Sequence, residues 1–185
     1  LATFFASWYN EVKSSKERNM GKIEIRRAVE ADLDALLQIY NYEVEYGVAT
    51  LDLNLKTMDE WRAWFAAHNV DNHPLFTALY DEEIAGYVSL SPYREKEAYK
   101  STVELSIYVS PNFRRLGVAT AMMEFILREA RADERTHTVV SVITAGNEAS
   151  TTLHEKFGFE YCGKITEVGV KFGRYLDIEN YRITV

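Results

Sequence analysis

The first indication of fold class in this 185-residue chain is one segment, Pro111-Asn112-Phe113-Arg114-Arg115-Leu116-Gly117-Val118-Ala119-Thr120. The segment joins a strand-like alternating pattern to a helix-like apolar pattern. Gly117 and Ala119 have little or no side chain, so a ligand can approach the backbone closely there. The dipole and the unpaired N–H groups of a first helical turn favour an anion, and Arg114 and Arg115 add cationic donors. We interpret the segment as a pyrophosphate site, the alternative being a plain loop with solvated arginines.

The rest of the chain shows the periodicities of strands and helices. Thr102 to Val109 alternates strictly, which predicts a strand with one apolar and one polar face. Thr57-Met58-Asp59-Glu60 has the pattern of a capping box, which predicts the start of a helix. By the same criteria the sequence predicts strands at 23–26, 75–80, 84–91, 102–109, 138–143, 159–162 and 172–181, and helices at 33–44, 57–68, from 118 onward, and at 149–157. This order predicts an α/β protein whose sheet is mostly antiparallel in its first half, with a βαβ crossover later.

Composition limits the partners and the compartment of the chain. It has 21 Lys and Arg against 28 Asp and Glu, a formal net charge of −7. Such a balance does not favour electrostatic binding to nucleic acid or to an anionic membrane, so neither is expected as a partner. No uninterrupted apolar run reaches the roughly 18 residues of a transmembrane helix. Because the one cysteine, Cys162, cannot form an internal disulfide, nothing marks the chain as secreted, and we expect a cytoplasmic protein.

Several other residues carry weaker signals. His68 and His73 have no third ligand at a diagnostic spacing, so we expect no metal site. Cys162 has no partner that would make it a nucleophile, and we expect it to be packed. Trp61 and Trp64 are expected to lie in the core or at a dimer contact.

The first twenty residues differ in pattern from the remainder. Leu1 to Tyr9 lacks the basic start and the long apolar stretch of a signal peptide. We expect residues 1–20 to be an N-terminal extension of uncertain origin and residues 21–185 to form one domain.

A second motif follows the glycine-arginine segment and identifies the family that the chain resembles. R-x-x-G-x-A at Arg114 to Ala119 is followed by N-x-x-S-x-x-L-H-x-K-x-G-F at Asn147 to Phe159. The pair closely resembles the GNAT superfamily of N-acetyltransferases, and the resemblance covers nearly all of residues 23–185. It implies the GNAT acyl-CoA N-acyltransferase fold, a mixed and mostly antiparallel sheet flanked by helices, with acetyl-CoA as co-substrate and no metal.

The resemblance also assigns residues to the cofactor. It implies that the main chain of Ile107 and Val109 pairs with the pantetheine arm and that Asn147 contacts the cofactor further along. The pyrophosphate would be surrounded by the residues of the glycine-arginine segment, namely Arg114, Arg115, Gly117, Val118, Ala119 and Thr120.

A narrower resemblance points to the phosphinothricin acetyltransferase branch. Ser91-Pro92-Tyr93-Arg94, Leu153 to Phe159 and Val168 to Asp177 are similar to that branch, whose members carry His at the position of His154. The resemblance implies that Glu104 is the general base with His154 assisting. It implies that Arg94 binds a substrate carboxylate, that Thr102 adds a hydrogen bond, and that the protein is a homodimer.

The chemistry of amine acetylation is consistent with these assignments. An ammonium has no lone pair, so a base must remove a proton directly or through water before the nitrogen can attack a thioester. Glu104 and His154 are the candidates, and which of them takes the first proton is open. Without their context, Glu104 would be a solvated carboxylate, His154 an ordinary helix residue and Arg94 a loop charge.

The sequence therefore predicts an acetyl-CoA-dependent N-acetyltransferase that acts on the amino group of a small amino-acid-like molecule by direct transfer. Phosphinothricin, methionine sulfone and methionine sulfoximine are the substrates that the resemblance implies. The alternatives are acetylation of a protein N-terminus or a polyamine, and a non-catalytic acyl-CoA-binding module. Arg94 counts against a polyamine, which has no carboxylate to bind, and retention of both Glu104 and His154 counts against a non-catalytic module.

Overall fold

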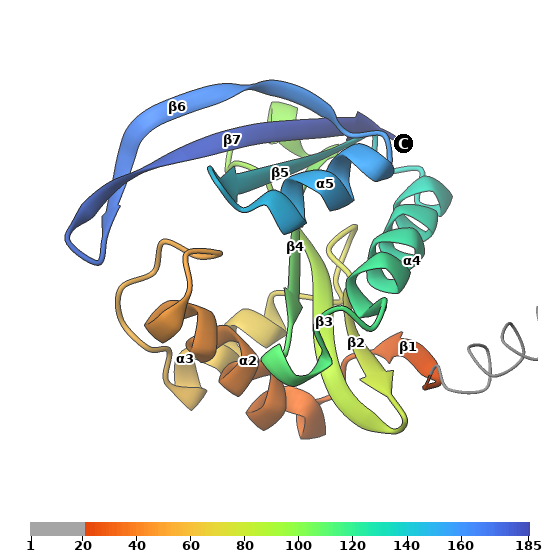
Figure 1. The fold of residues 1–185 in the computed structure, drawn as a ribbon. Coiled ribbons are helices and arrows are strands. Elements are labelled where there is room, and N and C mark those ends of the chain that lie inside the picture. Colours follow the sequence, from red (N-terminus) through yellow and green to blue (C-terminus); the bar gives the residue numbers. More distant parts are fainter. Residues whose placement is uncertain (1–20) are drawn as a thin grey trace, which may run out of the picture.

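The computed structural model describes residues 21–185, so the expected extension at residues 1–20 lies outside the described part. Seven strands form one sheet in the order β1-β2-β3-β4-β5-β7-β6 (Figure 1). The strands are β1 (Ile23–Arg27), β2 (Leu75–Tyr80), β3 (Glu83–Pro92), β4 (Thr102–Val109), β5 (Thr138–Thr144), β6 (Glu160–Lys171) and β7 (Arg174–Thr184). The α-helices are α2 (Leu33–Tyr46), α3 (Met58–Ala66), α4 (Val118–Ala132) and α5 (Glu148–Lys156), and short 3-10 helices lie at Glu30–Asp32, Glu97–Tyr99 and Pro111–Phe113.

The pairing of the strands confirms the predicted α/β fold. All neighbouring strands pair antiparallel except β4 and β5, which are parallel and are connected through α4. The β4–β5 ladder is short, since it joins only Thr102, Val103 and Glu104 to Thr138, Val139 and Val140. Beyond Glu104 the two strands separate, so the sheet opens on one side of β4 (Figure 1).

Helices cover both faces of the sheet and create two apolar cores. On one face, Val103 and Leu105 of β4 pack with Met122 and Ile126 of α4. On the other face, Tyr87 of β3 packs with residues of α2 and α3, which include Leu36, Ile39 and Trp61. Because side chains alternate along a strand, successive residues of β4 belong to different cores. Side chains from the helices on both faces of the sheet therefore reach the opening between β4 and β5.

Local sequence signals account for the ends of several elements. The Thr57 hydroxyl oxygen accepts from the Glu60 backbone N–H at 3.3 Å, and the Thr57 N–H donates to the Glu60 carboxylate at 2.8 Å. This reciprocal pair is the predicted capping box at the start of α3. Between β2 and β3, Asp81 and Glu82 both have positive φ values, 48° and 72°, which turn the chain tightly into the hairpin.

The structure corrects two expectations about β6. The strand extends over Glu160–Lys171, far beyond the predicted 159–162, because its pairing with β7 continues along an edge where the side chains are mostly exposed. Such an edge strand lacks the alternating apolar pattern by which strands are recognised. Cys162 lies on this edge and is exposed, so the expectation that it is packed was wrong.

Candidate active site

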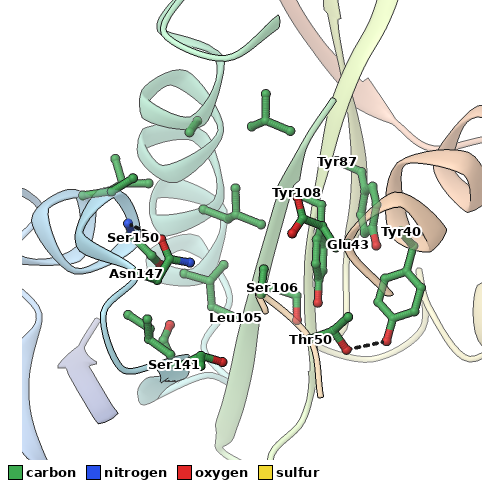
Figure 2. Close-up of a pocket in the computed structure, with 18 of the residues that line it drawn as sticks. Tyr40, Glu43, Thr50, Tyr87, Leu105, Ser106, Tyr108, Ser141, Asn147 and Ser150 are labelled. Atoms are coloured by element: carbon green, nitrogen blue, oxygen red, sulfur yellow. Dashed lines mark hydrogen bonds between the residues drawn. The ribbon is translucent and has the colours of Figure 1, made fainter. Parts of the chain in front are cut away.

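A pocket of about 1350 Å³ lies where β4 and β5 separate. Its wall is built from α2, residues 48–52, β4, the segment 113–120, the end of β5 and the first turns of α5 (Figure 2). Ligand pockets usually measure roughly 300 to 1000 Å³. This pocket therefore has room for a long ligand along β4 and for a second, smaller one.

The pocket brings most of the sequence-predicted site residues together. The residues among them that line it are Glu104, Ile107, Val109, Arg114, Arg115, Gly117, Val118, Ala119, Thr120, Asn147 and His154. Arg94 and Thr102 are not part of this lining. The Arg94 guanidinium instead lies over the rings of Tyr93, at 4.9 Å, and Tyr99, at 5.8 Å.

The segment before α4 has the geometry of an anion site. Gly117 is the N-cap residue of α4 and has a φ of 86°, and Arg115 also has a positive φ, 65°. Glycine adopts this left-handed conformation without strain and carries no side chain to cap the helix. The N–H groups of the first turn of α4 therefore remain available to an anion in the pocket.

Arg114 has a partner that the sequence did not indicate. Its guanidinium forms an ion pair with the Glu43 carboxylate of α2 and lies over the Tyr42 ring at 5.6 Å. The Glu43 side chain is largely buried, whereas the Arg114 side chain is about half exposed. This pair joins the glycine-arginine segment to the helix layer on the other side of the pocket.

The main chain of β4 is open toward the pocket. From Leu105 to Val109 the strand keeps its ladder with β3 but has no ladder with β5 within residues 21–185. N–H and C=O groups on that side are thus free to pair with an extended ligand, as happens when a peptide adds a strand to a sheet. Ile107 and Val109, predicted to offer such main-chain contacts, lie in this open part.

Glu104 is the last residue of the short parallel ladder. It pairs with Ser91 on β3 and with Val140 on β5, and it shares a face with Ser106 and Tyr108, which is the face covered by α2 and α3. Burial without a nearby cation raises the pKa of the Glu104 carboxyl above its ordinary value. A carboxylate with a raised pKa is a stronger base, which suits proton removal from an amine.

His154 lies on α5, on the opposite face of the sheet from Glu104. It is buried, with 5% of its surface exposed, and its ring packs against Phe159 and Tyr181 of the core that contains α4. Its Nδ1 lies 2.8 Å from the Ser150 carbonyl oxygen and its Nε2 lies 2.9 Å from the Ser141 hydroxyl. Since a carbonyl only accepts, Nδ1 carries the hydrogen and Nε2 accepts from Ser141.

The environment of His154 determines its charge. Burial lowers the pKa of His154 below its ordinary value of 6.5, and the hydrogen bond to Ser150 opposes this only in part. The imidazole is therefore neutral at pH 7 and can accept a proton at Nε2. No hydrogen bond joins Glu104 to His154 in the described part of the chain, and the assistance of Glu104 by His154 stays a prediction.

Aromatic side chains that the sequence did not assign to the site line its α2–α3 half. Tyr40, Tyr87 and Tyr108 surround this half together with Trp61 and Trp64 (Figure 2 labels the tyrosines). The ring centroids of Tyr87 and Tyr108 are 5.2 Å apart, and those of Trp61 and Trp64 are 4.2 Å apart. Trp61 is buried in the core, as one of the two predicted alternatives had it. This half of the pocket is thus lined largely by aromatic rings and lies next to Glu104.

Residues 48–52 close the same half, and hydrogen bonds from β5 and β6 hold their main chain in place. The Thr144 hydroxyl donates to the Val48 carbonyl at 2.6 Å. The Lys171 ammonium donates to the Thr50 carbonyl at 2.9 Å and to the Glu43 carbonyl at 3.1 Å. The segment is thus positioned by β5 and by the end of β6, which are remote from it in sequence.

Two negative observations complete the geometry. Between residues 21 and 185 no group of three or more His, Cys, Asp or Glu side chains is arranged to hold a metal ion. None of the helices in that range combines the length and the apolar character that spanning a bilayer requires.

Comparison with known proteins places the chain in a family. The sequence matches the Acetyltransferase (GNAT) family over residues 36–159. It is 37% identical to a phosphinothricin N-acetyltransferase of Streptomyces coelicolor, over 86% of this chain and 95% of that one. It is 36% identical to an L-methionine sulfoximine/L-methionine sulfone acetyltransferase of Pseudomonas paraeruginosa, over 83% of this chain and 90% of that one.

Solved structures show the same fold. A phosphinothricin acetyltransferase from Sinorhizobium meliloti in complex with AcCoA has a TM-score of 0.84 and 30% identity, covering 88% of each chain. A ribosomal-protein-alanine N-acetyltransferase from Brucella melitensis has a TM-score of 0.84 and 38% identity, covering 88% of this chain and 99% of that one. Together with the family match over residues 36–159, these likenesses show that the chain is an N-acetyltransferase and belongs to the GNAT family.

Proposed function

We propose that this enzyme transfers the acetyl group of acetyl-CoA to the amino group of a small amino-acid-like substrate of the phosphinothricin, methionine sulfone or methionine sulfoximine type. The observation that carries the proposal is the single pocket in which the anion site before α4, the open main chain of β4 and Glu104 meet. The names of the relatives from Streptomyces coelicolor and Pseudomonas paraeruginosa support the substrate class.

The residues present fit acetyl-CoA, which supplies the activated acyl group as a thioester. We assign its pyrophosphate to the first turn of α4 and to the adjacent cations, that is, to Arg114, Arg115, Gly117, Val118, Ala119 and Thr120. The pantetheine arm would pair with the main chain of Ile107 and Val109, which has no ladder with β5. Asn147 lies at the N-cap of α5, where its side chain accepts from the Ser150 N–H at 3.2 Å, and it would contact the cofactor from there.

We assign the amine to the α2–α3 half of the pocket, beside Glu104. The Glu104 carboxylate would take the proton of the substrate ammonium, and the raised pKa that burial imposes makes it better suited to that task. The β3–β4 register pairs Ser91 with Glu104 and Pro92 with Val103. Arg94 comes two residues after Pro92 and Thr102 comes just before Val103, so both belong to the same end of this strand pair. A substrate with its amine at Glu104 would thus direct its carboxylate toward Arg94 and Thr102.

Assembly and location form a second part of the proposal. We expect residues 21–185 to be one domain of a cytoplasmic homodimer without nucleic-acid or membrane partners. Phe172 and Tyr175, at the tip of the β6–β7 hairpin, are more than half exposed, and exposed aromatic side chains of this kind often mark a protein contact. Light scattering of the purified protein checks the homodimer, and a monomer at micromolar concentration would contradict it.

One alternative acceptor has support from the comparisons. The Brucella melitensis structure is named as a ribosomal-protein-alanine N-acetyltransferase, which favours a protein N-terminus as the acceptor. A peptide has no carboxylate next to its α-amine, so it would leave Arg94 without the partner that we assign to it. A free amino acid analogue supplies both groups.

A substrate panel tests the proposal. Purified protein is incubated with acetyl-CoA and one of phosphinothricin, methionine sulfone, methionine sulfoximine, spermidine or an N-terminal alanyl peptide, and thiol release is followed. We expect release with the amino-acid analogues and little with spermidine or the peptide. Release with the peptide alone would establish the alternative, and release with none of them would contradict an acetyltransferase acting on these amines.

Arg94→Met tests the assigned carboxylate contact. Because a bidentate guanidinium–carboxylate pair contributes roughly 1.5 to 3 kcal/mol, we expect the KM for the amino-acid analogue to rise at least about tenfold. The KM for acetyl-CoA is expected to stay the same. Arg128→Met, at an exposed arginine of α4 that lies outside the pocket, is the matched control. An unchanged amine KM in Arg94→Met would remove Arg94 from the site.

A further inference from the structure

Both ring nitrogens of His154 are already occupied by hydrogen bonds. Nδ1 donates to the Ser150 carbonyl at 2.8 Å, and Nε2 accepts from the Ser141 hydroxyl at 2.9 Å. A buried imidazole bonded in this way has no free nitrogen with which to meet a substrate. Any proton that His154 exchanges with the pocket must therefore pass through the Ser141 hydroxyl.

Ser141 lies at the point where the sheet opens. It follows Val140, the residue of β5 that pairs with Glu104 in the last step of the β4–β5 ladder. It is buried, with 2% of its surface exposed, and it lines the pocket across from Leu105 and Ser106 of β4 (Figure 2). Its hydrogen points to His154, and the lone pairs of its oxygen can accept a proton from a group in the pocket.

Glu104 and the Ser141–His154 pair lie on opposite sides of the sheet. Glu104 shares the face of Ser106 and Tyr108, which packs under α2 and α3. His154 packs with Phe159 and Tyr181 in the core of the other face. The opening between β4 and β5 is where the two sides meet, so the two bases approach the reacting atoms from different directions.

We propose that Ser141 is the relay through which His154 exchanges protons with the reacting atoms, and that Glu104 serves a different proton. This inference rests on the proposed function. The first proton, from the substrate ammonium, goes to the Glu104 carboxylate. As the amine nitrogen bonds to the acetyl carbon, its second proton moves to Ser141 Oγ while the hydrogen of Ser141 moves to His154 Nε2.

The return of that proton closes the cycle. When the carbon–sulfur bond breaks, its electron pair stays on sulfur. The proton then passes from His154 Nε2 to Ser141 and from Ser141 to the sulfur, so a free thiol leaves. His154 ends neutral, as it began, and the net proton released by the reaction is the one on Glu104. In the proposed cycle each of the two bases is used once.

The test compares Ser141→Ala, His154→Gln and the double variant on the amine that the wild-type enzyme acetylates best. We expect each single variant to lower kcat about tenfold or more. The kcat of the double variant should equal that of the less active single variant, because the two side chains act as one unit. Acetyl-CoA affinity, measured by calorimetry, is expected to change less than twofold. Ser141→Thr keeps a hydroxyl at this position and is expected to restore most of the lost turnover.

A pH profile separates a relay from packing alone. In the wild type, protonation of His154 on acidification should add a step to the acid limb of kcat, and Ser141→Ala should lose this step as His154→Gln does. Thr77→Val is the matched control and should keep the wild-type acid limb, since Thr77 is also a buried strand residue whose hydroxyl donates a hydrogen bond, to Asp32 at 2.9 Å, but it does not line the pocket.

Three results would overturn the relay. They are full turnover in Ser141→Ala, losses in the double variant that multiply those of the single variants, and an acetyl group on Ser141 in acid-quenched enzyme, which would indicate covalent transfer. A wild-type enzyme that acetylates none of the panel amines would instead contradict the proposed function, so the two failures are distinguishable.

Discussion

Glu104→Gln is expected to lower kcat/KM for the amine by about 100-fold or more. The size follows from the loss of a general base, which usually contributes about 10² to 10⁴ in rate. Gln keeps the shape and one oxygen but cannot take a proton at assay pH. Acetyl-CoA affinity should be unchanged, because the assigned cofactor contacts begin beyond Glu104 on β4 and before α4. Steady-state kinetics with calorimetry of acetyl-CoA binding measures both quantities.

The raised pKa of Glu104 also predicts how kcat/KM changes with pH. Burial raises the pKa of Glu104, so its carboxylate is lost at a higher pH than that of an ordinary glutamate as the solution is acidified. Wild-type kcat/KM should therefore fall as the pH decreases through that raised pKa, and Glu104→Gln should lack this part of the acid limb. Glu24→Gln, at an exposed carboxylate of β1 paired with Lys22, is the control and should match the wild type.

Stability distinguishes this loss from unfolding. A carboxyl whose pKa is raised on folding binds its proton more tightly in the folded state, so its ionisation at higher pH reduces the free energy of unfolding. Replacing Glu104 by neutral Gln should thus leave the thermal midpoint at pH 8 equal to that of the wild type or above it. A turnover within about threefold of the wild type would contradict the base assignment, whereas a midpoint well below the wild type would attribute the loss of activity to unfolding.

Lys171→Met is expected to reduce the free energy of unfolding by about 1.5 to 3 kcal/mol, which is the usual contribution of one hydrogen bond to a charged group. The Lys171 side chain is buried, with 2% of the residue exposed, and its ammonium donates to the Thr50 and Glu43 carbonyls. The Glu43 carbonyl keeps the Gly47 N–H at 3.1 Å, but Thr50 would lose the only donor described for its carbonyl. Chemical denaturation of both proteins measures the difference.

The same substitution should affect the amine more than the cofactor. Residues 48–52 line the α2–α3 half of the pocket, and Lys171 holds their main chain against α2. With the segment released, we expect the amine KM to rise about tenfold while the acetyl-CoA KM changes less than threefold. Thr144→Val removes the hydrogen bond to the Val48 carbonyl of the same segment. It should likewise raise the amine KM more than the acetyl-CoA KM.

Lys164→Met is the matched control for Lys171→Met. Lys164 lies on the same strand, but it is more exposed and pairs with Asp177 at 3.3 Å and Glu179 at 3.8 Å. Such pairs contribute at most about 1 kcal/mol, so stability and both KM values should remain close to the wild type. Equal effects of Lys164→Met and Lys171→Met, or equal shifts of both KM values in Lys171→Met, would show that Lys171 does not position this segment.

The parts of the fold that were predicted correctly are those that neighbouring residues specify. Strict alternation from Thr102 to Val109 gave a strand with the same bounds in the structure, and Thr57 with Glu60 formed the predicted capping box. The helix expected from residue 118 onward begins at Val118 in the structure. In each case the information lies within one turn of helix or one strand.

The exposed edge strand shows where local pattern fails. β6 has few buried residues, so its side chains carry little apolar periodicity, and its length follows from the ladder with β7. The position of Cys162 follows from the same ladder, which places it at the edge of the sheet rather than in the core. The length of β6 depends on its pairing with β7, so the residues of β6 alone do not determine it.

Local sequence thus specified the elements to which we assign the chemistry: the glycine-arginine segment before α4, the strand that carries Glu104, and the helix that carries His154. The folded chain specified how these groups are paired, since Arg114 meets Glu43 across 71 residues and Lys171 meets Thr50 across 121. It also brought the Ser141 hydroxyl against His154 Nε2 in the pocket wall, and it placed Glu104 on the opposite face. Dipoles, caps and alternation depend on neighbours in the chain, whereas ion pairs and proton routes depend on distances that only packing sets.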